Sequence, residues 1–259
     1  LFELPVQGGE PGMKKWVMVD GNGTYFIGTF DGKKFTPETE RHRGDWGGVL
    51  RQHFMATQTW SDMPQGRRVQ VAWMRHFDRK IFPQKGMPFN QLMTFPVDLT
   101  LRMTPQGPRL FSWPIPEIKK LHGQSWSTEG AQQMQQDARP LDTRLDANDI
   151  FIEIQPRGAA KAGVEIRGEK IVYDPQKQEL DLWGKKMPVT LDEDGVLRLR
   201  VLLDRCGIEV FAQQGRERAS LVFFPDDANR SLTLIAETPK DADAPILRSL
   251  NIIEVRSIW

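Results

Sequence analysis

Hydrophobic and polar positions alternate most clearly in the stretch TYFIGTFDGKKF, near the start of the chain. Successive side chains of a β-strand point to opposite faces of a sheet, so the alternation over residues 25–30 predicts a strand. Asp31 and Gly32 follow, and both tolerate the positive φ of a tight turn, after which Phe35 begins the return. The stretch therefore predicts a β-hairpin.

Two further strands are expected in the first half of the chain, and helical periodicity is almost absent there. Residues 69–73 follow the turn sequence MPQGR, and residues 99–103 precede the turn sequence TPQGP. The segment 137–149 contains scattered apolar residues, but Pro140 in its middle argues against a helix. The first half is therefore expected to be built from strands.

From residue 150 onward the pattern is one of short strands at close intervals. In VLRLRVLLDRCGIEVF, leucines and valines alternate with Arg198 and Arg200, which is typical of a sheet with one dry face. Strands are expected at residues 151–154, 163–167, 170–173, 179–183, 196–203, 207–211, 219–224, 232–236 and 250–255. Many short strands in succession predict a β-sandwich.

A Pro-rich segment divides the chain into two expected domains. The sequence SWPIPEIKKL, residues 112–121, lies between the two strand-rich halves and resembles a domain junction. We therefore expect domains at residues 1–116 and 117–259. The fold class is all-β in both parts.

Charge and cysteine content exclude several classes of partner. The 259 residues carry a net charge of +1, which gives no long-range field for nucleic acid or for a membrane surface. No apolar stretch reaches the length of a membrane span. Cys206 is the single cysteine, so no intrachain disulfide forms. A neutral substrate or partner fits this composition best.

Motifs for cofactors, metals and serine nucleophiles are missing. Neither GxGxxG nor GxxxxGKS occurs, and no Ser lies in a GxSxG context. The four histidines are scattered and no CxxC is present, so no metal and no cofactor are expected. The chain has eight Trp and fourteen Phe, and Trp often stacks on sugar rings, although core packing is its commoner role.

Several motifs, taken in order, resemble the later part of glycoside hydrolase family 32, which contains levanases, inulinases and invertases. The resemblance runs from Leu1 to about Phe211. The matching stretches are LFELPV, YFIGTFDGKKFTPE, ATQTWSDMPQGRRVQVAWMR, MPFNQLMTFPVDLTLR, GPRLF followed by PIPEI, and LLDRCGIEVF. It implies the later blades of a five-bladed β-propeller at residues 1–116, followed by a β-sandwich at residues 117–259.

The resemblance also implies a retaining hydrolase that releases fructose from fructans or sucrose. Such an enzyme needs two carboxyl groups, one as nucleophile and one as acid/base. The family places them in Trp-Met-Asn-Asp-Pro-Asn-Gly and Glu-Cys-Pro-Asp, with a stabilising Asp in Arg-Asp-Pro, and none of these motifs occurs here. Glu-Cys-Pro-Asp normally runs into Leu-Phe-Glu-Leu-Pro, so we expect the catalytic carboxylates upstream of Leu1. We expect no catalytic residue within this chain, Glu3 included, and no hydrolysis by the chain alone.

Some substrate-binding residues are nevertheless implied by the resemblance. Trp73, in QVAWMR, matches a Trp that lines the fructose pocket, with packing within a blade as the alternative. Asn90, Gln91 and Met87 lie in a loop that the family folds toward the pocket rim, with stabilisation of a turn as the alternative for Asn90.

Two other elements of the first domain, around Asp45 and at residues 57–59, bear on the candidate site. Asp45, in RGDWGG, matches an Asp-aromatic-Gly element, and we include it among the candidate substrate-binding residues. Residues 57–59, Thr-Gln-Thr, favour a role at a strand edge over a contact with sugar.

Expected partners follow from the same resemblance. The substrate would be a fructan or a sucrose-type carbohydrate, with no nucleic acid and no membrane. Part of a propeller has exposed blade edges, so self-association or pairing with the missing N-terminal half of the family fold is also expected. A carbohydrate-binding or assembly module, and a fructosyltransferase, stay open as alternatives. The compartment is unknown, with a secreted or periplasmic location favoured.

Overall fold

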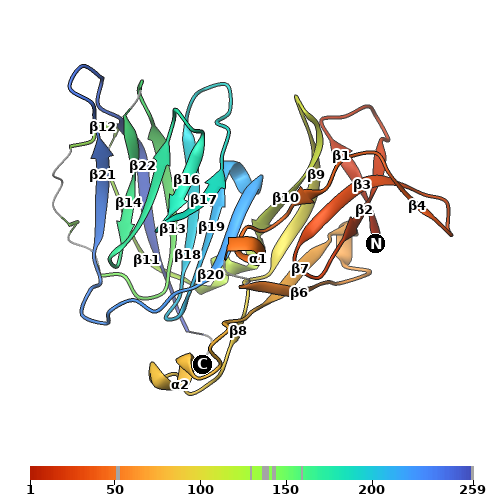
Figure 1. Ribbon diagram of the computed structural model, residues 1–259, viewed down its shortest axis with the longest axis horizontal. Coiled ribbons are helices and arrows are strands. Elements are labelled where there is room, and N and C mark those ends of the chain that lie inside the picture. Colours follow the sequence, from red (N-terminus) through yellow and green to blue (C-terminus); the bar gives the residue numbers. More distant parts are fainter. Residues whose placement is uncertain (51–52, 129, 136–139, 142–143, 159, 258–259) are drawn as a thin grey trace. The chain divides into compact units, whose positions relative to one another are not determined.

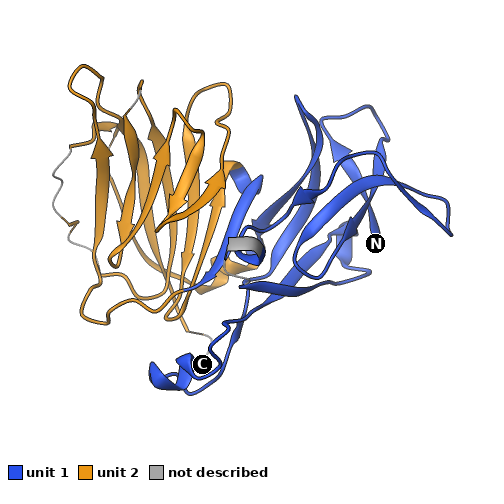
Figure 2. Ribbon diagram, in the orientation of Figure 1, with its two compact units in different colours: residues 1–116, 214–222 blue, residues 117–213, 223–259 orange. Residues whose placement is uncertain are grey.

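Strands dominate the computed structural model, which describes residues 1–50, 53–128, 130–135, 140–141, 144–158 and 160–257 (Figure 1). The chain divides into two compact units (Figure 2). Unit 1 comprises residues 1–116 and 214–222, and unit 2 comprises residues 117–213 and 223–259. Residues 214–222 were expected in the second domain, and the structure packs them with the first.

Unit 1 is built on a sheet of ten strands with the main order β4-β3-β2-β1-β9-β7-β6. Beside this path, β10 pairs with β9, β5 with β3, and β8 with β7. The strands are β1 (Phe2–Gln7), β2 (Lys14–Val19), β3 (Thr24–Phe30), β4 (Phe35–Pro37), β5 (His42–Arg43), β6 (Phe54–Thr59), β7 (Val69–Met74), β8 (Leu92–Met93), β9 (Val97–Thr104) and β10 (Gly107–Pro114).

Period-two patterning fixes the orientation of β1 within this sheet. Phe2, Leu4 and Val6 are buried, while Glu3 between them is exposed. The strand is antiparallel to β2, and its last residues lie parallel to β9, where Val6 is opposite Leu101. These alternate apolar side chains contribute to the core of unit 1.

The expected hairpin is confirmed. β3 and β4 are antiparallel, Phe30 is opposite Phe35, and the turn between them contains Gly32 at φ +93°. That backbone angle favours glycine because a side chain there would be strained. The strands expected at residues 69–73 and 99–103 lie within β7 and β9.

Helices are few and short. They are α1 (Gly47–Leu50), η1 (Pro64–Gly66), α2 (Ile81–Gln84), η2 (Pro116–Leu121) and η3 (Gln213–Gly215). Among the residues that the structure describes, no helix has the length and apolarity required to cross a membrane.

Unit 2 contains two antiparallel sheets, stacked against one another (Figure 1). Within unit 2, the strands of one sheet have the order β11-β22-β13-β18-β19, with β12 beside β22, and the same sheet continues from β19 to β20 (Glu217–Val222); the other sheet has the order β17-β16-β15-β14-β21. The strands are β11 (His122–Ser127), β12 (Gln132–Gln133), β13 (Asn148–Gln155), β14 (Lys161–Ile166), β15 (Glu169–Asp174), β16 (Glu179–Leu182), β17 (Lys185–Pro188), β18 (Leu197–Leu203), β19 (Gly207–Ala212), β21 (Leu232–Glu237) and β22 (Ile246–Val255).

Each of the nine strands expected in the second half overlaps an observed strand, with differences at the ends. β16 stops at Leu182, one residue before its expected end, because Trp183 has φ +40° and begins a turn. The segment around Pro140 falls partly outside the described residues. Its last two residues, Asn148 and Asp149, open β13 and are not helical.

The segment that joins unit 1 from the second half contains β20 (Glu217–Val222). Gly215 precedes this strand at φ +86°, and a Cβ atom there would lie 1.9 Å from the Ser112 carbonyl oxygen. Only glycine allows the backbone to approach β10 this closely. The chain therefore enters unit 1 through a glycine turn.

Candidate functional site

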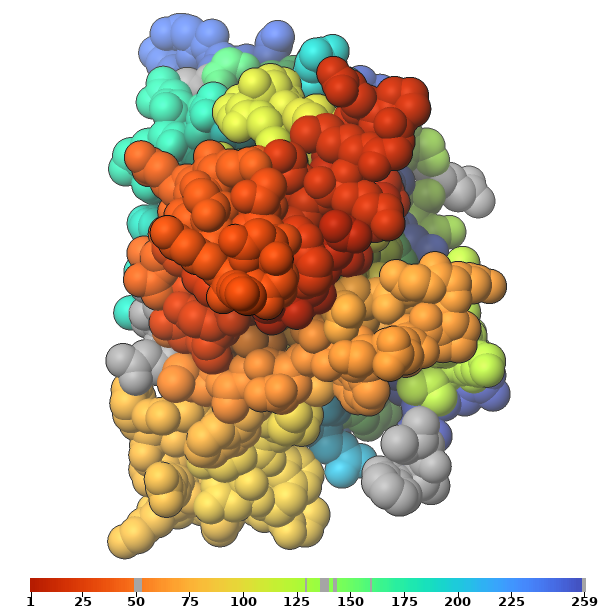
Figure 3. Space-filling model, turned by 90° about the vertical axis from the view of Figure 1, so that its right-hand side faces the viewer, coloured from red at the N-terminus to blue at the C-terminus, as the bar shows by residue number. Residues whose placement is uncertain are grey.

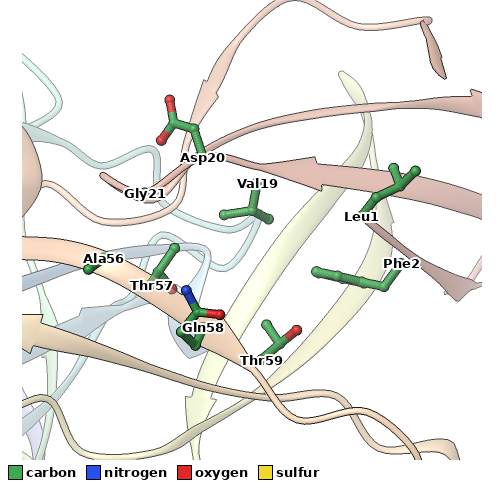
Figure 4. A pocket seen from close by; sticks show the side chains of 9 residues that line it. All are labelled: Leu1, Phe2, Val19, Asp20, Gly21, Ala56, Thr57, Gln58 and Thr59. Carbon is green, nitrogen blue, oxygen red and sulfur yellow. The ribbon is translucent and has the colours of Figure 1, made fainter. Parts of the chain in front are cut away.

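A cavity of about 320 Å³ opens in unit 1 between the start of β1, the turn after β2, and β6 (Figure 4). Its lining residues are Leu1, Phe2, Val19, Asp20, Gly21, Ala56, Thr57, Gln58 and Thr59. Figure 4 shows Leu1, Phe2 and Val19 facing residues 56–59 across the space. Three segments far apart in sequence thus form one site.

A β-bulge positions the β6 wall of this cavity. The pairing of β6 with β7 shifts register between Met55 and Gln58, and Ala56 has φ +51°. The Thr57 backbone N–H donates a hydrogen bond to the Gly21 carbonyl oxygen at 3.2 Å, which ties the bulge to the turn after β2. Bulges change the direction of nearby side chains, and this one brings residues 56–59 to the cavity.

The opposite wall is held by a cation–π contact. The Arg68 guanidinium lies 4.8 Å from the centre of the Phe2 ring. Arg68 is itself fixed because its Nη1 donates a hydrogen bond to the Trp60 carbonyl oxygen at 2.9 Å. Such a contact stabilises the ring position by roughly 0.5–1 kcal/mol at a partly exposed site.

The chemistry of the lining suits a neutral ligand rich in hydroxyl groups. The Gln58 amide and the hydroxyls of Thr57 and Thr59 can donate and accept hydrogen bonds. Leu1, Phe2 and Val19 supply the apolar surface against which C–H groups can pack.

Asp20 is the acidic residue of the lining, and its carboxylate is already engaged. It accepts hydrogen bonds from the Thr24 hydroxyl at 2.5 Å, from the Asn22 and Thr24 backbone N–H groups, and from Arg41 Nη2 at 2.8 Å. Partial burial acts to raise the pKa of Asp20, but the hydrogen bonds from Thr24, Asn22 and Arg41 together lower it. In Figure 4 the carboxylate points away from the cavity.

The cavity lacks the pair of carboxyl groups that retaining hydrolysis requires. Such pairs lie about 5–5.5 Å apart on either side of the scissile bond. Among the described residues that line this cavity, Asp20 is the single one with a carboxylate. Glu3 lies on the other face of β1 from Phe2 and forms an ion pair with Lys14, 3.5 Å away. Within the described ranges, no group of three or more His, Cys, Asp and Glu is arranged to hold a metal ion.

Trp73 lies on β7, beside the strand that lines the cavity. It is half-buried, its Cα partners are Met55 on β6 and Met93 on β8, and the Arg75 guanidinium lies 5.8 Å from its ring. Trp73 does not belong to the cavity lining in Figure 4. Its role in substrate binding stays a prediction.

The other loop residues that were expected at the pocket rim lie between α2 and β8. Gln91 has φ +70°, accepts a hydrogen bond from the His76 backbone N–H at 2.6 Å, and donates one to Asn90 Oδ1 at 3.1 Å. The Met87 backbone N–H donates to the Phe82 carbonyl oxygen at 2.9 Å. Figure 3 shows the segment around α2 in yellow on the surface of unit 1. These residues form a set separate from the cavity lining, and their contact with substrate stays a prediction.

Asp45 lies in the core, where the sequence suggested a substrate-binding residue. It is fully buried, and its Oδ2 lies 2.9 Å from Arg218 Nε and accepts a hydrogen bond from the Ser220 hydroxyl at 2.7 Å. Its Oδ1 accepts from the backbone N–H groups of Gly47 and Ser220. These bonds join residues 45–47 to β20.

A second carboxylate, which is half-buried, lies next to Arg218 in the sequence. Glu217 Oε2 accepts a hydrogen bond from Trp46 Nε1 at 2.8 Å, and burial raises the pKa of Glu217 to about 7. In the same region His42 contacts Arg109 and lies 5.2 Å from the Tyr25 ring. Burial lowers the pKa of His42 to about 4. These groups titrate inside unit 1, away from the cavity lining.

Sequence reasoning missed most of the cavity lining. It placed Thr57, Gln58 and Thr59 at a strand edge, and β6 does lie at the end of the sheet, but these residues also line the cavity. Nothing in the local sequence marks Gln58 as a lining residue, because the bulge that positions it depends on the turn at Gly21.

The architecture defines a class of proteins by fold, namely those that combine propeller blades with a β-sandwich. The exo-inulinase from Aspergillus awamori superimposes with a TM-score of 0.77 at 19% identity, covering 100% of this chain and 56% of that one. Fructan 1-exohydrolase IIa from Cichorium intybus superimposes with a TM-score of 0.72 at 16% identity, covering 99% and 61%. The expected fold class, blades of a β-propeller followed by a β-sandwich, is confirmed.

Sequence comparison gives the family. Residues 6–114 match the glycosyl hydrolases family 32 N-terminal domain, and residues 117–254 match the glycosyl hydrolases family 32 C-terminal domain. The chain belongs to glycoside hydrolase family 32. It is 28% identical over 295 residues to the levanase of Bacillus subtilis (strain 168), covering 100% of this chain and 42% of that protein. It is also 28% identical to the levanase of Bacillus sp. (strain L7), of which it spans 31%.

Proposed function

We propose that this chain forms part of the fructoside-binding pocket of a retaining β-fructosidase that acts on fructans or sucrose-type carbohydrates. The observation that carries the proposal is the cavity of neutral polar and apolar side chains between β1 and β6, in a chain that belongs to family 32. The levanase of Bacillus subtilis is 28% identical to this chain, and its name supports a fructan as the class of substrate.

Each wall of the cavity has a role in this proposal. The Gln58 amide and the hydroxyls of Thr57 and Thr59 bind hydroxyl groups of a fructosyl unit, and Phe2 packs against its C–H groups. Trp73, Met87, Asn90 and Gln91 extend the binding surface along β7 and the loop before β8. Asp45 acts from the core by holding β20 against residues 45–47.

Catalysis requires groups that the cavity lining does not supply. The chain spans 31% and 42% of the two levanases that it matches, and its cavity contains one carboxylate, already bonded to Thr24 and Arg41. We therefore place the nucleophile and the acid/base outside these 259 residues. The chain alone binds fructosides and does not cleave them.

Pairing through strand edges belongs to the same proposal. In the described part of the chain, residues 2–5 of β1 pair with β2 on one side only, and β6 pairs only with β7. Unpaired edges favour addition of another strand, from a second copy or from further family 32 sequence.

Binding of short levan or inulin oligosaccharides to the 259-residue chain, measured by calorimetry, tests the proposal. Gln58→Ala is expected to weaken binding about five- to tenfold, because it removes a hydrogen bond of roughly 1 kcal/mol. Gln176→Ala, an exposed turn residue in unit 2, is the matched control and should leave binding unchanged. Equal affinity of the parent and Gln58→Ala proteins would contradict the assigned pocket. Release of fructose by the chain alone would contradict the placement of the carboxylates.

A further inference from the structure

A second cavity in unit 1 differs in chemical character from the cavity between β1 and β6. It has a volume of about 290 Å³ and is lined by Asn22, Thr24, Arg41 and Arg43. The turn after β2 separates the two, because Asp20 and Gly21 line the first cavity while Asn22 and Thr24 line the second. Two of the four lining residues of this second cavity are cationic.

Strand geometry places the two arginines on one side of the sheet. Arg43, on β5, is directly opposite Thr24 on β3, so their side chains lie on the same face. Arg41 precedes Arg43 by two residues, and the period-two repeat of extended chain gives it the same side. The lining therefore follows from the pairing of β5 with β3.

Arg41 is held in place before any ligand binds. Its Nε donates a hydrogen bond to the Thr24 hydroxyl at 2.9 Å, and its Nη2 donates to Asp20 Oδ2 at 2.8 Å. Asp20 is fixed in turn by the backbone N–H groups of Asn22 and Thr24. Of the five N–H donors of this guanidinium, those on Nη1 take no part in these bonds.

Arg43 is oriented by stacking instead of by an acidic partner. Its guanidinium lies over the Trp46 ring, 5.1 Å from the ring centre. Within the residues that the structure describes, it makes no ion pair with a carboxylate. Stacking uses the flat face of the guanidinium and leaves its N–H edge for hydrogen bonds.

The balance of charge in this cavity favours an anion. Two guanidinium groups are offset by one carboxylate, Asp20, whereas the whole chain carries a net charge of only +1. Both arginines are exposed, and guanidinium forks match the geometry of phosphate oxygens. Asn22 adds a side-chain amide to the donors of the lining.

We propose that the cavity between β3 and β5 binds a phosphoryl oxyanion through Arg41 and Arg43. The residues that line this site differ from those that line the cavity between β1 and β6. Binding of an oxyanion here therefore does not depend on the proposed function. The oxyanion reaches it either as free phosphate or as the phosphate ester of a sugar, since both present the same oxygens to the two arginines.

Titration of the 259-residue chain with inorganic phosphate, followed by NMR or calorimetry, tests the proposal. Saturable binding is expected, and Arg43→Gln should weaken it at least about tenfold, because a charged hydrogen-bonding group contributes roughly 1.5–3 kcal/mol. Arg79→Gln, which removes an exposed arginine elsewhere in unit 1, should change the affinity less than about twofold and controls for net charge. Arg41→Gln is a second variant whose phosphate affinity should fall. Its unfolding in urea is measured in parallel, because Arg41 also bonds to Asp20 and Thr24 and so supports the turn after β2.

One further ligand, fructose 6-phosphate, identifies the source of the oxyanion. Tighter binding of fructose 6-phosphate than of inorganic phosphate, lost in Arg43→Gln, indicates a sugar phosphate, whereas equal affinities indicate free phosphate. Phosphate binding that is linear without saturation, or that is equal in the parent and Arg43→Gln proteins, overturns the proposal. The Gln58→Ala variant should keep its phosphate affinity, so failure of the fructoside pocket and failure of this site give different results.

Discussion

Replacement of Arg218 by Met tests whether the buried ion pair holds β20 in unit 1. Arg218 is 2% exposed, its Nε lies 2.9 Å from Asp45 Oδ2, and its Nη2 donates a hydrogen bond to Gln70 Oε1 at 2.7 Å. Methionine keeps much of the length of the side chain and removes the charge. The variant would leave the Asp45 carboxylate buried without its cation.

The expected cost follows from these contacts. Loss of one partner from a buried ion pair destabilises a protein by about 3–5 kcal/mol. Asp45 keeps hydrogen bonds from the Ser220 hydroxyl and from two backbone N–H groups. The loss of stability from leaving its carboxylate without a cation is therefore at the lower end of this range, about 3 kcal/mol. The lost bond to Gln70 adds about 1 kcal/mol, so Arg218→Met should lower the free energy of unfolding of unit 1 by about 4 kcal/mol.

A double-mutant cycle separates the charge from the packing. Asp45→Asn combined with Arg218→Met removes both charges, and the double variant is expected to be more stable than Arg218→Met alone by about 2 kcal/mol. Arg205→Met, an exposed arginine in unit 2, is the control and should cost less than about 0.5 kcal/mol.

Urea unfolding gives the free energies, and hydrogen exchange over residues 214–222 reports the local effect. Exchange in this segment should rise in Arg218→Met before exchange in β9 does, because the ion pair holds β20 directly. A loss below about 1 kcal/mol in Arg218→Met, or a double variant less stable than Arg218→Met, would refute the reasoning.

Two other predictions concern unit 1. Burial raises the pKa of Glu217 from 4.5 to about 7, so the folded state binds the proton more tightly and stability falls as pH rises between these values, by up to about 3 kcal/mol. Glu217→Gln should abolish that fall in urea midpoints compared at about pH 5 and about pH 8, and an unchanged pH dependence would contradict the assignment. The unpaired edges of β1 and β6 predict association that increases with concentration in light scattering, whereas a monomer at every concentration would count against edge pairing.

Local signals in the sequence were sufficient to predict most of the secondary structure. The hairpin around Gly32 was predictable because alternation and turn chemistry lie within a dozen residues. The alternation of leucines and arginines likewise predicted the strand β18, and Leu197, Leu199 and Val201 are buried as expected. The expectation of a single buried face was wrong at Arg200, which is also buried because it forms an ion pair with Asp149. In both cases the determining interactions lie within one strand or one turn.

Contacts between distant segments could not be predicted in this way. Asp45 resembles a site residue in its local sequence, and its partner Arg218 follows 173 residues later, in the half expected to form a separate domain. The cavity lining depends on a bulge at Ala56 and on a hydrogen bond to Gly21, and neither leaves a mark in the sequence around Gln58. Such features arise from tertiary packing, which periodicity does not report.

The passage of residues 214–222 into unit 1 bears on how this protein can be recombined. An exchange of C-terminal domains between family members at Pro116 would carry β20 along with the foreign domain and leave Asp45 facing whatever residue that domain has in place of Arg218. A chimera that keeps the native Gly215 turn and Arg218 while exchanging the remainder of unit 2 preserves the buried charge balance. In the design of chimeras, the first domain and β20 should therefore come from the same protein.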